Sequence, residues 1–121
     1  MNDTPTPTRL LIADDNAATR AATIALLESS GRQAAIWEAA DGEAAVQLAE
    51  NIQPDVILMD VQMPKLDGIR ATRRIKACWP TIKVIVLTMY VTYQAAALAA
   101  GADAFLLKGG SADGLITAVF Q

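Results

Sequence analysis

Short apolar runs alternate with segments of helical length over almost the whole chain, and this alternation limits the possible folds more than any other feature. Strands that alternate with helices form parallel sheets, and right-handed crossovers place the helices on both faces of the sheet. We therefore predict an α/β fold with one doubly wound, five-stranded parallel sheet. The predicted strands are residues 9–13, 34–37, 56–59, 84–87 and 104–107, and the predicted helices are residues 17–30, 42–51, 68–79, 91–100 and 112–120.

The composition agrees with a single domain at residues 9–121. The sequence has 121 residues, of which 53% are hydrophobic, and a chain of this length can bury a core without disulfides. Residues 1–8 are polar, and we expect them to form a disordered lead-in. No apolar run approaches the ~18 residues of a membrane helix, and the beginning lacks the features of a signal peptide. With the single Cys78, interpreted as a small buried residue and not a redox thiol, these features predict a cytoplasmic protein that does not contact membranes.

The charge and the absence of histidine exclude several kinds of function. The formal net charge is −3, so this domain is a poor candidate for binding nucleic acid by itself. The sequence contains no His, which removes the commonest general base, the commonest metal ligand and any phosphohistidine within it. If phosphoryl chemistry occurs here, a partner must supply the histidine.

Polar residues follow four of the predicted strands, and the third strand is the centre of this set. Residues 56–59 read as a strand buried on both faces, which ends at Asp60. In a parallel sheet, the residues just past the carboxyl ends of the strands share one edge, where such folds place their sites. Alone, each of these polar residues is more typical of a turn, a helix cap or a solvated charge, and only the combination is specific. The combination consists of Asp14, Asp15, Asp60, Thr88 and Lys108. Asp67 is instead expected to cap the helix at residues 68–79.

Three neighbouring carboxylates repel one another, and a divalent cation would relieve that repulsion. Oxygen ligands favour Mg²⁺, which usually keeps room for water and phosphate oxygens. Asp60 is then a plausible nucleophile that forms an acyl phosphate. Lys108 and the cation would neutralise charge on the phosphoryl oxygens, and the Thr88 hydroxyl would donate to one of them.

These residues, together with the pattern at residues 56–68, resemble the receiver domain of bacterial two-component response regulators. The resemblance covers residues 9–121 and implies a flavodoxin-like sheet with strand order 2-1-3-4-5. It implies that Asp60 is the phosphoacceptor and that the domain assists only its own phosphorylation and dephosphorylation, without being an enzyme. It further implies that Asp15, Asp60 and the main-chain carbonyl of Gln62 bind Mg²⁺ directly, whereas Asp14 acts largely through a metal-bound water. By the same resemblance, Thr88 and Lys108 contact the phosphate, and Phe105 is an aromatic switch residue.

The segments at residues 87–90 and 100–109 look like the NarL/FixJ (LuxR-type) subgroup, in which Gly often follows the conserved Lys, as Gly109 does here. The resemblance implies a histidine kinase as phosphodonor, homodimerisation on activation, and DNA binding only through a C-terminal helix-turn-helix effector domain. That effector domain is absent from this sequence, so we expect an excised receiver or a natural single-domain protein.

Other functions fit the sequence less well. Phosphohydrolases with an aspartyl-phosphate intermediate commonly carry a second Asp two residues after the nucleophile, but this chain has Gln62 there and no cap insertion. Dinucleotide-binding domains need a Gly-rich turn after the first strand, where this chain has acidic residues. A pseudo-receiver, which keeps the fold as an interaction module without phosphorylation, stays open as the alternative.

The predicted fourth helix has an unusual composition. Residues 91–102 contain no charged residue, and seven of the twelve are Ala or Gly. Alanine alone favours a helix, which is one explanation of this composition. The other explanation is that a partner, another copy or an effector domain covers this uncharged face.

Overall fold

A computed structural model describes residues 6–121, so most of the lead-in predicted at residues 1–8 lies outside the described residues. Thr8, the last residue of that lead-in, already belongs to the first strand and donates its backbone N–H to Gln33. Within residues 6–121, no helix is both long and apolar enough to cross a membrane. The elements are β1 (Thr8–Ala13), α1 (Ala17–Glu28), β2 (Ala34–Ala39), α2 (Gly42–Ile52), β3 (Val56–Met59), α3 (Gly68–Cys78), β4 (Lys83–Thr88), the 3₁₀ turn η1 (Val91–Tyr93), α4 (Gln94–Ala99), β5 (Ala104–Leu107) and α5 (Ala112–Phe120).

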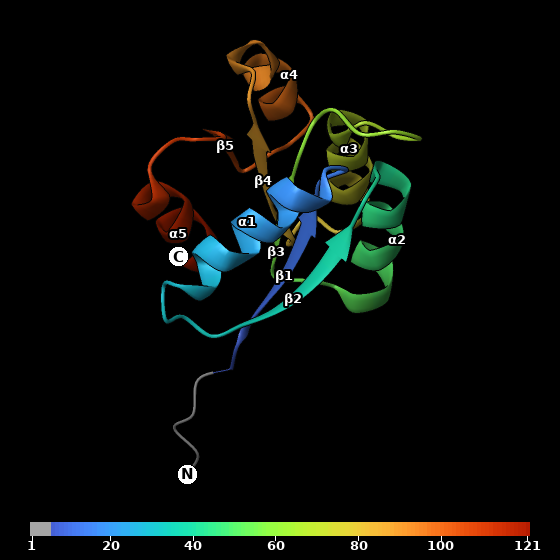
Figure 1. The fold of residues 1–121 in the computed structure, drawn as a ribbon. Coiled ribbons are helices and arrows are strands. Elements are labelled where there is room, and N and C mark those ends of the chain that lie inside the picture. The colour runs from blue at the N-terminus through green and yellow to red at the C-terminus, as the bar shows by residue number, and fades with distance from the viewer. Residues whose placement is uncertain (1–5) are drawn as a thin grey trace.

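The predicted sheet is confirmed. Its five strands are all parallel, in the order β2-β1-β3-β4-β5 (Figure 1). The central strand β3 is buried at every residue, as expected for a strand covered on both faces.

Two layers of apolar side chains lie on opposite faces of the sheet. One face packs Leu11 and Ile57 against α2 and α3, whereas the other packs Leu10 and Leu58 against α1 and α5. A smaller cluster around Val86 lies beneath α4. The strands are thereby fixed on both sides, so the loops at their carboxyl ends start from rigid positions.

Polar side chains cap four of the five α-helices at their N-termini. Each capping oxygen accepts a hydrogen bond from the backbone N–H three residues later, which satisfies one of the free donors of the first turn. Asp67 was predicted in this role. The capping residues are Asn16, Asp41, Asp67 and Ser111.

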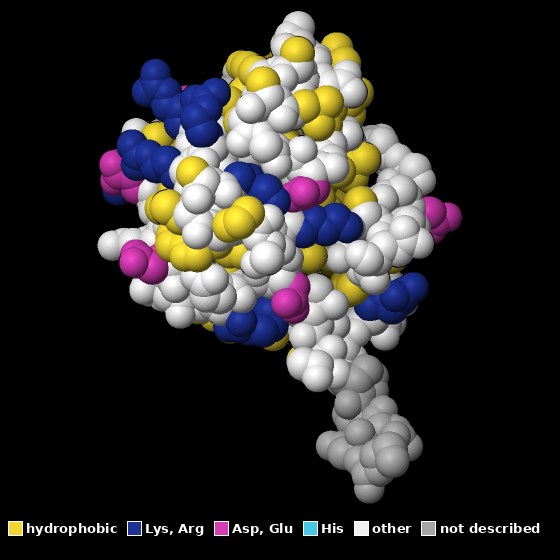
Figure 2. All heavy atoms as spheres, turned by 180° about the vertical axis from the view of Figure 1, so that it is seen from behind, with side chains coloured by type: hydrophobic (Ala, Val, Ile, Leu, Met, Phe, Trp, Pro, Cys, Tyr) yellow, Lys and Arg dark blue, Asp and Glu magenta, His cyan; other side chains and the backbone are white. Residues whose placement is uncertain are grey.

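The predicted fourth helix, residues 91–100, is only partly α-helical. Its first three residues form η1, and the α-helix covers only Gln94–Ala99. Val91 and Thr92 are β-branched and Tyr93 is aromatic, so they are weak helix formers, whereas the following residues are alanine-rich. No side chain caps either η1 or α4. The short α4 forms the top of the molecule, where Figure 2 shows neither basic nor acidic side chains.

Cys78 is exposed, which contradicts the prediction that it is buried. Three earlier residues on its helix face, Gly68, Ala71 and Ile75, are buried as the apolar spacing predicts. Cys78 is the last residue of α3, so the face that covers the core ends one turn before it.

Candidate functional site

Three carboxylates meet at the carboxyl edge of the sheet. Asp14 and Asp15 follow β1, and Asp60 follows the neighbouring strand β3. Asp14 and Asp60 are buried while Asp15 is exposed, and one carboxylate oxygen from each lies within 4.8 Å of those of the other two. The structure therefore brings together all three acids that the sequence analysis placed at this edge.

Lys108 joins two of these acids. Its Nζ lies 2.9 Å from Oδ2 of Asp14 and 3.1 Å from Oδ2 of Asp60. The lysine comes from the end of β5, where its backbone N–H donates to the carbonyl of Thr88 at 2.8 Å. Its side chain is largely buried, so the ammonium group offsets the charge of the acids away from bulk solvent.

The environment changes the pKa of two of these groups. Burial raises the pKa of the Asp60 carboxyl, and the neighbouring Asp14 adds to this, against the opposing effect of the hydrogen bond from Lys108. Burial acts to lower the pKa of Lys108, but its hydrogen bonds to Asp14 and Asp60 outweigh this effect, and its pKa is raised. Without a cation, the ammonium group is thus held charged, and the central carboxylate is costly to ionise.

The backbone fixes Asp60 closely. Its N–H donates to the carbonyl of Ala13 at 2.9 Å, and its Oδ1 accepts from the N–H of Val61 at 2.8 Å. The loop that follows closes where the N–H of Gly68 donates to Val61 at 2.8 Å. A Cβ at Gly68 would lie only 1.7 Å from the carbonyl oxygen of Asp60, so only glycine lets α3 begin this close to the acid.

The donor atoms at this edge suit Mg²⁺. Carboxylate oxygens from Asp14, Asp15 and Asp60 are close enough to surround one cation, and oxygen ligands are those that Mg²⁺ prefers. Gln62, whose main-chain carbonyl was the further expected ligand, lies two residues beyond Asp60 in the same loop. Its exposed side chain points to another element, with Nε2 donating to Oη of Tyr93 at 3.0 Å.

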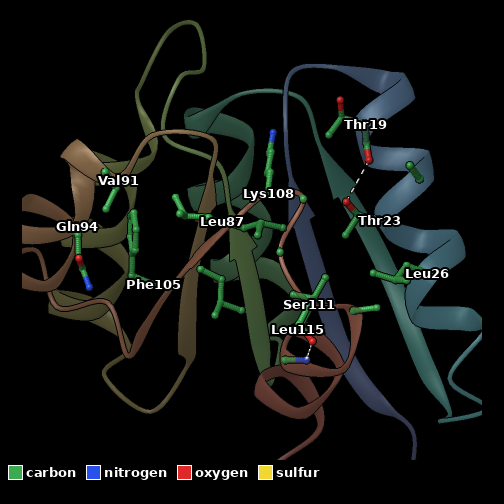
Figure 3. A pocket seen from close by; sticks show the side chains of 17 residues that line it. Thr19, Thr23, Leu26, Leu87, Val91, Gln94, Phe105, Lys108, Ser111 and Leu115 are labelled. Atoms are coloured by element: carbon green, nitrogen blue, oxygen red, sulfur yellow. Dashed lines mark hydrogen bonds between the residues drawn. The ribbon is translucent and has the colours of Figure 1, made fainter.

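Thr88 is buried at the end of β4, the strand next to β3. Phe105 lies one strand further out, in β5, and is half-buried. It lines an apolar groove of about 650 Å³ that reaches from α1 to α5 and the start of η1, and it lies beside Val91 and Gln94 (Figure 3). The groove also contains Lys108, so one cavity connects the predicted switch residue with a lysine that contacts the acids.

An ion pair that was not predicted lies next to the acids. Arg20 of α1 donates from Nε to Oε1 of Glu38 on β2 at 2.7 Å, and from Nη1 to the main-chain carbonyl of Asp14 at 2.6 Å. Glu38 was expected just past the second strand, but β2 continues through it to Ala39. A basic residue one turn into the helix that follows Asp14–Asp15 was the only signal, and sequence spacing does not reveal its partners.

Comparison with known proteins gives a consistent result. A family model described as response regulator receiver domain matches residues 10–120. The transcriptional regulatory protein DegU of Brevibacillus brevis is 39% identical over 113 residues, which are 92% of this chain and 48% of DegU. The protein-glutamate methylesterase/protein-glutamine glutaminase 4 of Myxococcus xanthus is 39% identical over 105 residues, which are 84% of this chain and 30% of that protein.

Among solved structures, the signal receiver domain of NarL from Mycobacterium tuberculosis superimposes with a TM-score of 0.88 at 30% identity, covering 95% of this chain and 94% of that one. The chain therefore spans about half the length of DegU and less of the methylesterase, but nearly all of an isolated receiver domain.

Proposed function

This chain belongs to the response regulator receiver family, whose model matches residues 10–120, and from this premise we propose that it is a phosphorylation-dependent switch with Asp60 as phosphoacceptor. DegU and the NarL receiver support its place in the NarL/FixJ subgroup of two-component response regulators. The observation that carries the proposal is the acid pocket, in which three carboxylates converge and Lys108 contacts both Asp14 and Asp60.

In the proposed reaction, an oxygen of the Asp60 carboxylate attacks the phosphorus of a phosphohistidine on a histidine kinase. The new O–P bond makes an acyl phosphate, while the N–P bond breaks and leaves its electron pair on the imidazole nitrogen, which takes a proton from water. This sequence contains no His, so the donor histidine lies outside it. The hydrogen bond from Val61 to Oδ1 of Asp60 restricts rotation of the carboxylate before the attack.

The other residues of the pocket hold the charges in place. Asp15, Asp60 and the main-chain carbonyl of Gln62 would hold Mg²⁺, with Asp14 binding through water. When bound, the cation supplies positive charge beside the phosphoryl oxygens. Lys108 exchanges a carboxylate contact for a phosphoryl oxygen, and the Thr88 hydroxyl donates to another.

The output of the switch is a change of surface. Movement of Thr88 toward the phosphoryl group would draw the loop after β4 with it and let Phe105 turn inward. The surface around η1 and α4, which has exposed Met89, Tyr90 and Val91, would then change. We further propose that this change controls a helix-turn-helix effector and favours a homodimer, by analogy with transcriptional regulators such as DegU. The methylesterase relative indicates that receivers of this similarity also serve other effectors.

The proposal can be tested by intact mass after incubation with Mg²⁺ and acetyl phosphate. We expect one added phosphoryl group, which is lost on chelation of Mg²⁺, on treatment with hydroxylamine, and in Asp60→Asn. The matched control is Asp113→Asn, which changes an exposed acid in the first turn of α5 and should leave the modification intact.

A folded wild-type chain that gains no phosphoryl group, from acetyl phosphate or from a phosphorylated histidine kinase, would contradict the proposal. The pseudo-receiver would then be the better assignment. A phosphoryl group that persists in Asp60→Asn would instead contradict the choice of acceptor.

A further inference from the structure

The ion pair between Arg20 and Glu38 has no role in the phosphoryl chemistry described above, yet it contacts a residue of the acid pocket. Arg20 lies near the N-terminus of α1, where a positive charge is unfavourable because of the helix dipole. Glu38 lies on the face of β2 where its neighbour Ile36 packs into the core. The side chain of Glu38 is 50% exposed, and its 2.7 Å contact with Arg20 offsets the positive charge near the N-terminus of α1.

Arg20 does more than pair with Glu38, because its Nη1 also donates to the main-chain carbonyl of Asp14 at 2.6 Å. The guanidinium group can serve both acceptors at once, since its donors form a rigid fork. Its side chain is only 16% exposed, so it is held in the structure and is not a mobile surface group. The side chain therefore ties the loop after β1 to the neighbouring strand β2.

This contact controls the orientation of two acids together. The carbonyl of Asp14 and the N–H of Asp15 belong to one planar peptide unit, so holding the carbonyl also sets the direction in which the chain enters Asp15. The Asp14 side chain has its own contacts, to the N–H of Asn16 and to Lys108. Among residues 6–121, the exposed Asp15 carboxylate has no hydrogen-bond partner, so no side-chain contact directs it and the backbone sets where its side chain starts.

We propose that Arg20 is a positioning residue for the divalent cation and that it acts through the peptide unit between Asp14 and Asp15. The ion pair with Glu38 holds the Arg20 side chain in place. This inference rests on the proposed function, in which these acids hold Mg²⁺. It reaches beyond that function because Arg20 contacts neither the cation nor the phosphoryl group.

The proposal predicts whether removal of Arg20 weakens or tightens the binding of the cation. If Arg20 acted only as a nearby positive charge, its removal would tighten the binding of a cation, because a repulsive charge would be gone. If it acts by positioning, its removal weakens binding, because Asp15 loses the backbone orientation that aims its carboxylate. Loss of such an outer contact typically costs at least tenfold in metal affinity at other protein metal sites.

The test is calorimetric titration of the purified chain with Mg²⁺, together with the Tm of each variant in EDTA. We expect Arg20→Ala to raise the Mg²⁺ Kd about tenfold, and Glu38→Gln to raise it less. The double variant should be no weaker than Arg20→Ala alone, because the two residues act as one unit. Arg20→Lys keeps the charge but loses the fork, so its Kd should fall between wild type and Arg20→Ala. The control Arg74→Ala, an exposed arginine on α3, should bind as wild type does.

An Mg²⁺ Kd for Arg20→Ala that is unchanged or lower than that of wild type, when wild type binds Mg²⁺, overturns this inference and leaves the phosphoacceptor proposal standing. A lower Tm in EDTA with an unchanged Kd likewise assigns Arg20 a purely structural role. If Arg20→Ala does not fold, the Mg²⁺ Kd of Arg20→Lys and of Glu38→Gln is compared with that of wild type instead. Values that are unchanged or lower overturn the inference. A wild-type chain that does not bind Mg²⁺ overturns both proposals.

Discussion

The Asp60 carboxylate is buried beside another acid, and the fold bears a cost for keeping it charged. Its raised pKa, caused mainly by burial, means that the ionised form is less favourable in the folded chain than in the unfolded chain. We therefore expect Asp60→Asn, measured in EDTA, to raise the Tm by about 3–6 °C, which corresponds to roughly 1 kcal/mol for a domain of this size. A Tm equal to or below that of wild type would show that the contact with Lys108 stabilises the ionised carboxylate by more than burial destabilises it.

The same shift predicts how this difference depends on pH. Because the pKa of Asp60 is raised above the unfolded value of 3.8, the folded state binds more protons in the window between the two values. As pH falls toward 3.8 through the pKa that Asp60 has in the folded chain, the carboxylate is protonated. It then no longer destabilises the folded state. The Tm advantage of Asp60→Asn should consequently be largest near neutral pH and shrink under acid conditions. Thermal melts of both proteins from pH 7 to pH 4, in EDTA, provide the measurement.

Among the elements, α3 is placed by one glycine. A Cβ at Gly68 would meet backbone atoms of Asp60, which cannot move without shifting the end of β3. We expect Gly68→Ala to destabilise the domain by at least ~2 kcal/mol, within the usual range for overpacking. Urea unfolding gives the free energy directly.

Gly114→Ala is the matched control for this substitution. Gly114 lies in α5, where a new Cβ would meet Ser111 atoms no closer than 3.6 Å, an ordinary contact. Alanine is the better helix former, so the control should be neutral or stabilising by up to about 1 kcal/mol. Equal destabilisation by both substitutions would mean that the contact with Asp60 is not the cause.

How well each element could be predicted depends on whether its cause is local. The apolar run of β3 and the capping of α3 by Asp67 are local, and both predictions were confirmed. The start of α4 was predicted wrongly, because the alanine residues that favour a helix begin only after the β-branched residues Val91 and Thr92. Cys78 was predicted wrongly because helical spacing does not show where the covering core ends.

The acid pocket could be foreseen because a parallel sheet brings the ends of all its strands to one edge. That rule placed Asp14, Asp60 and Lys108 together without any distance information. It could not foresee the contact of Arg20 with Glu38, because Arg20 lies within α1, and a rule about strand ends does not place the side chains of helices. Such a pair becomes visible only when the helix is placed on the sheet.

For the whole molecule, Mg²⁺ binding should appear as added stability. A ligand that binds only the folded state stabilises it by ~2.7 kcal/mol at a hundred times its Kd. We expect the Tm to rise with Mg²⁺ concentration and to return to its starting value in EDTA. Asp15→Asn removes an exposed predicted ligand and should abolish most of the shift. A rise of similar size in that variant would indicate that the cation binds elsewhere.

The absence of charge from residues 91–102 has a consequence for how the molecule responds to its surroundings. Rearrangement of η1 and α4 breaks no ion pair between their own side chains, so dissolved salt has little to screen there. The acid pocket, by contrast, gathers three carboxylates, an ammonium and a proposed divalent cation, whose interactions at its exposed side weaken as ionic strength rises. In the proposed switch, ionic strength would therefore act on the binding of the cation and the phosphoryl group in the pocket. It would leave the proposed movement of η1 and α4 almost unchanged, so that the two parts of the switch would respond to different physical variables.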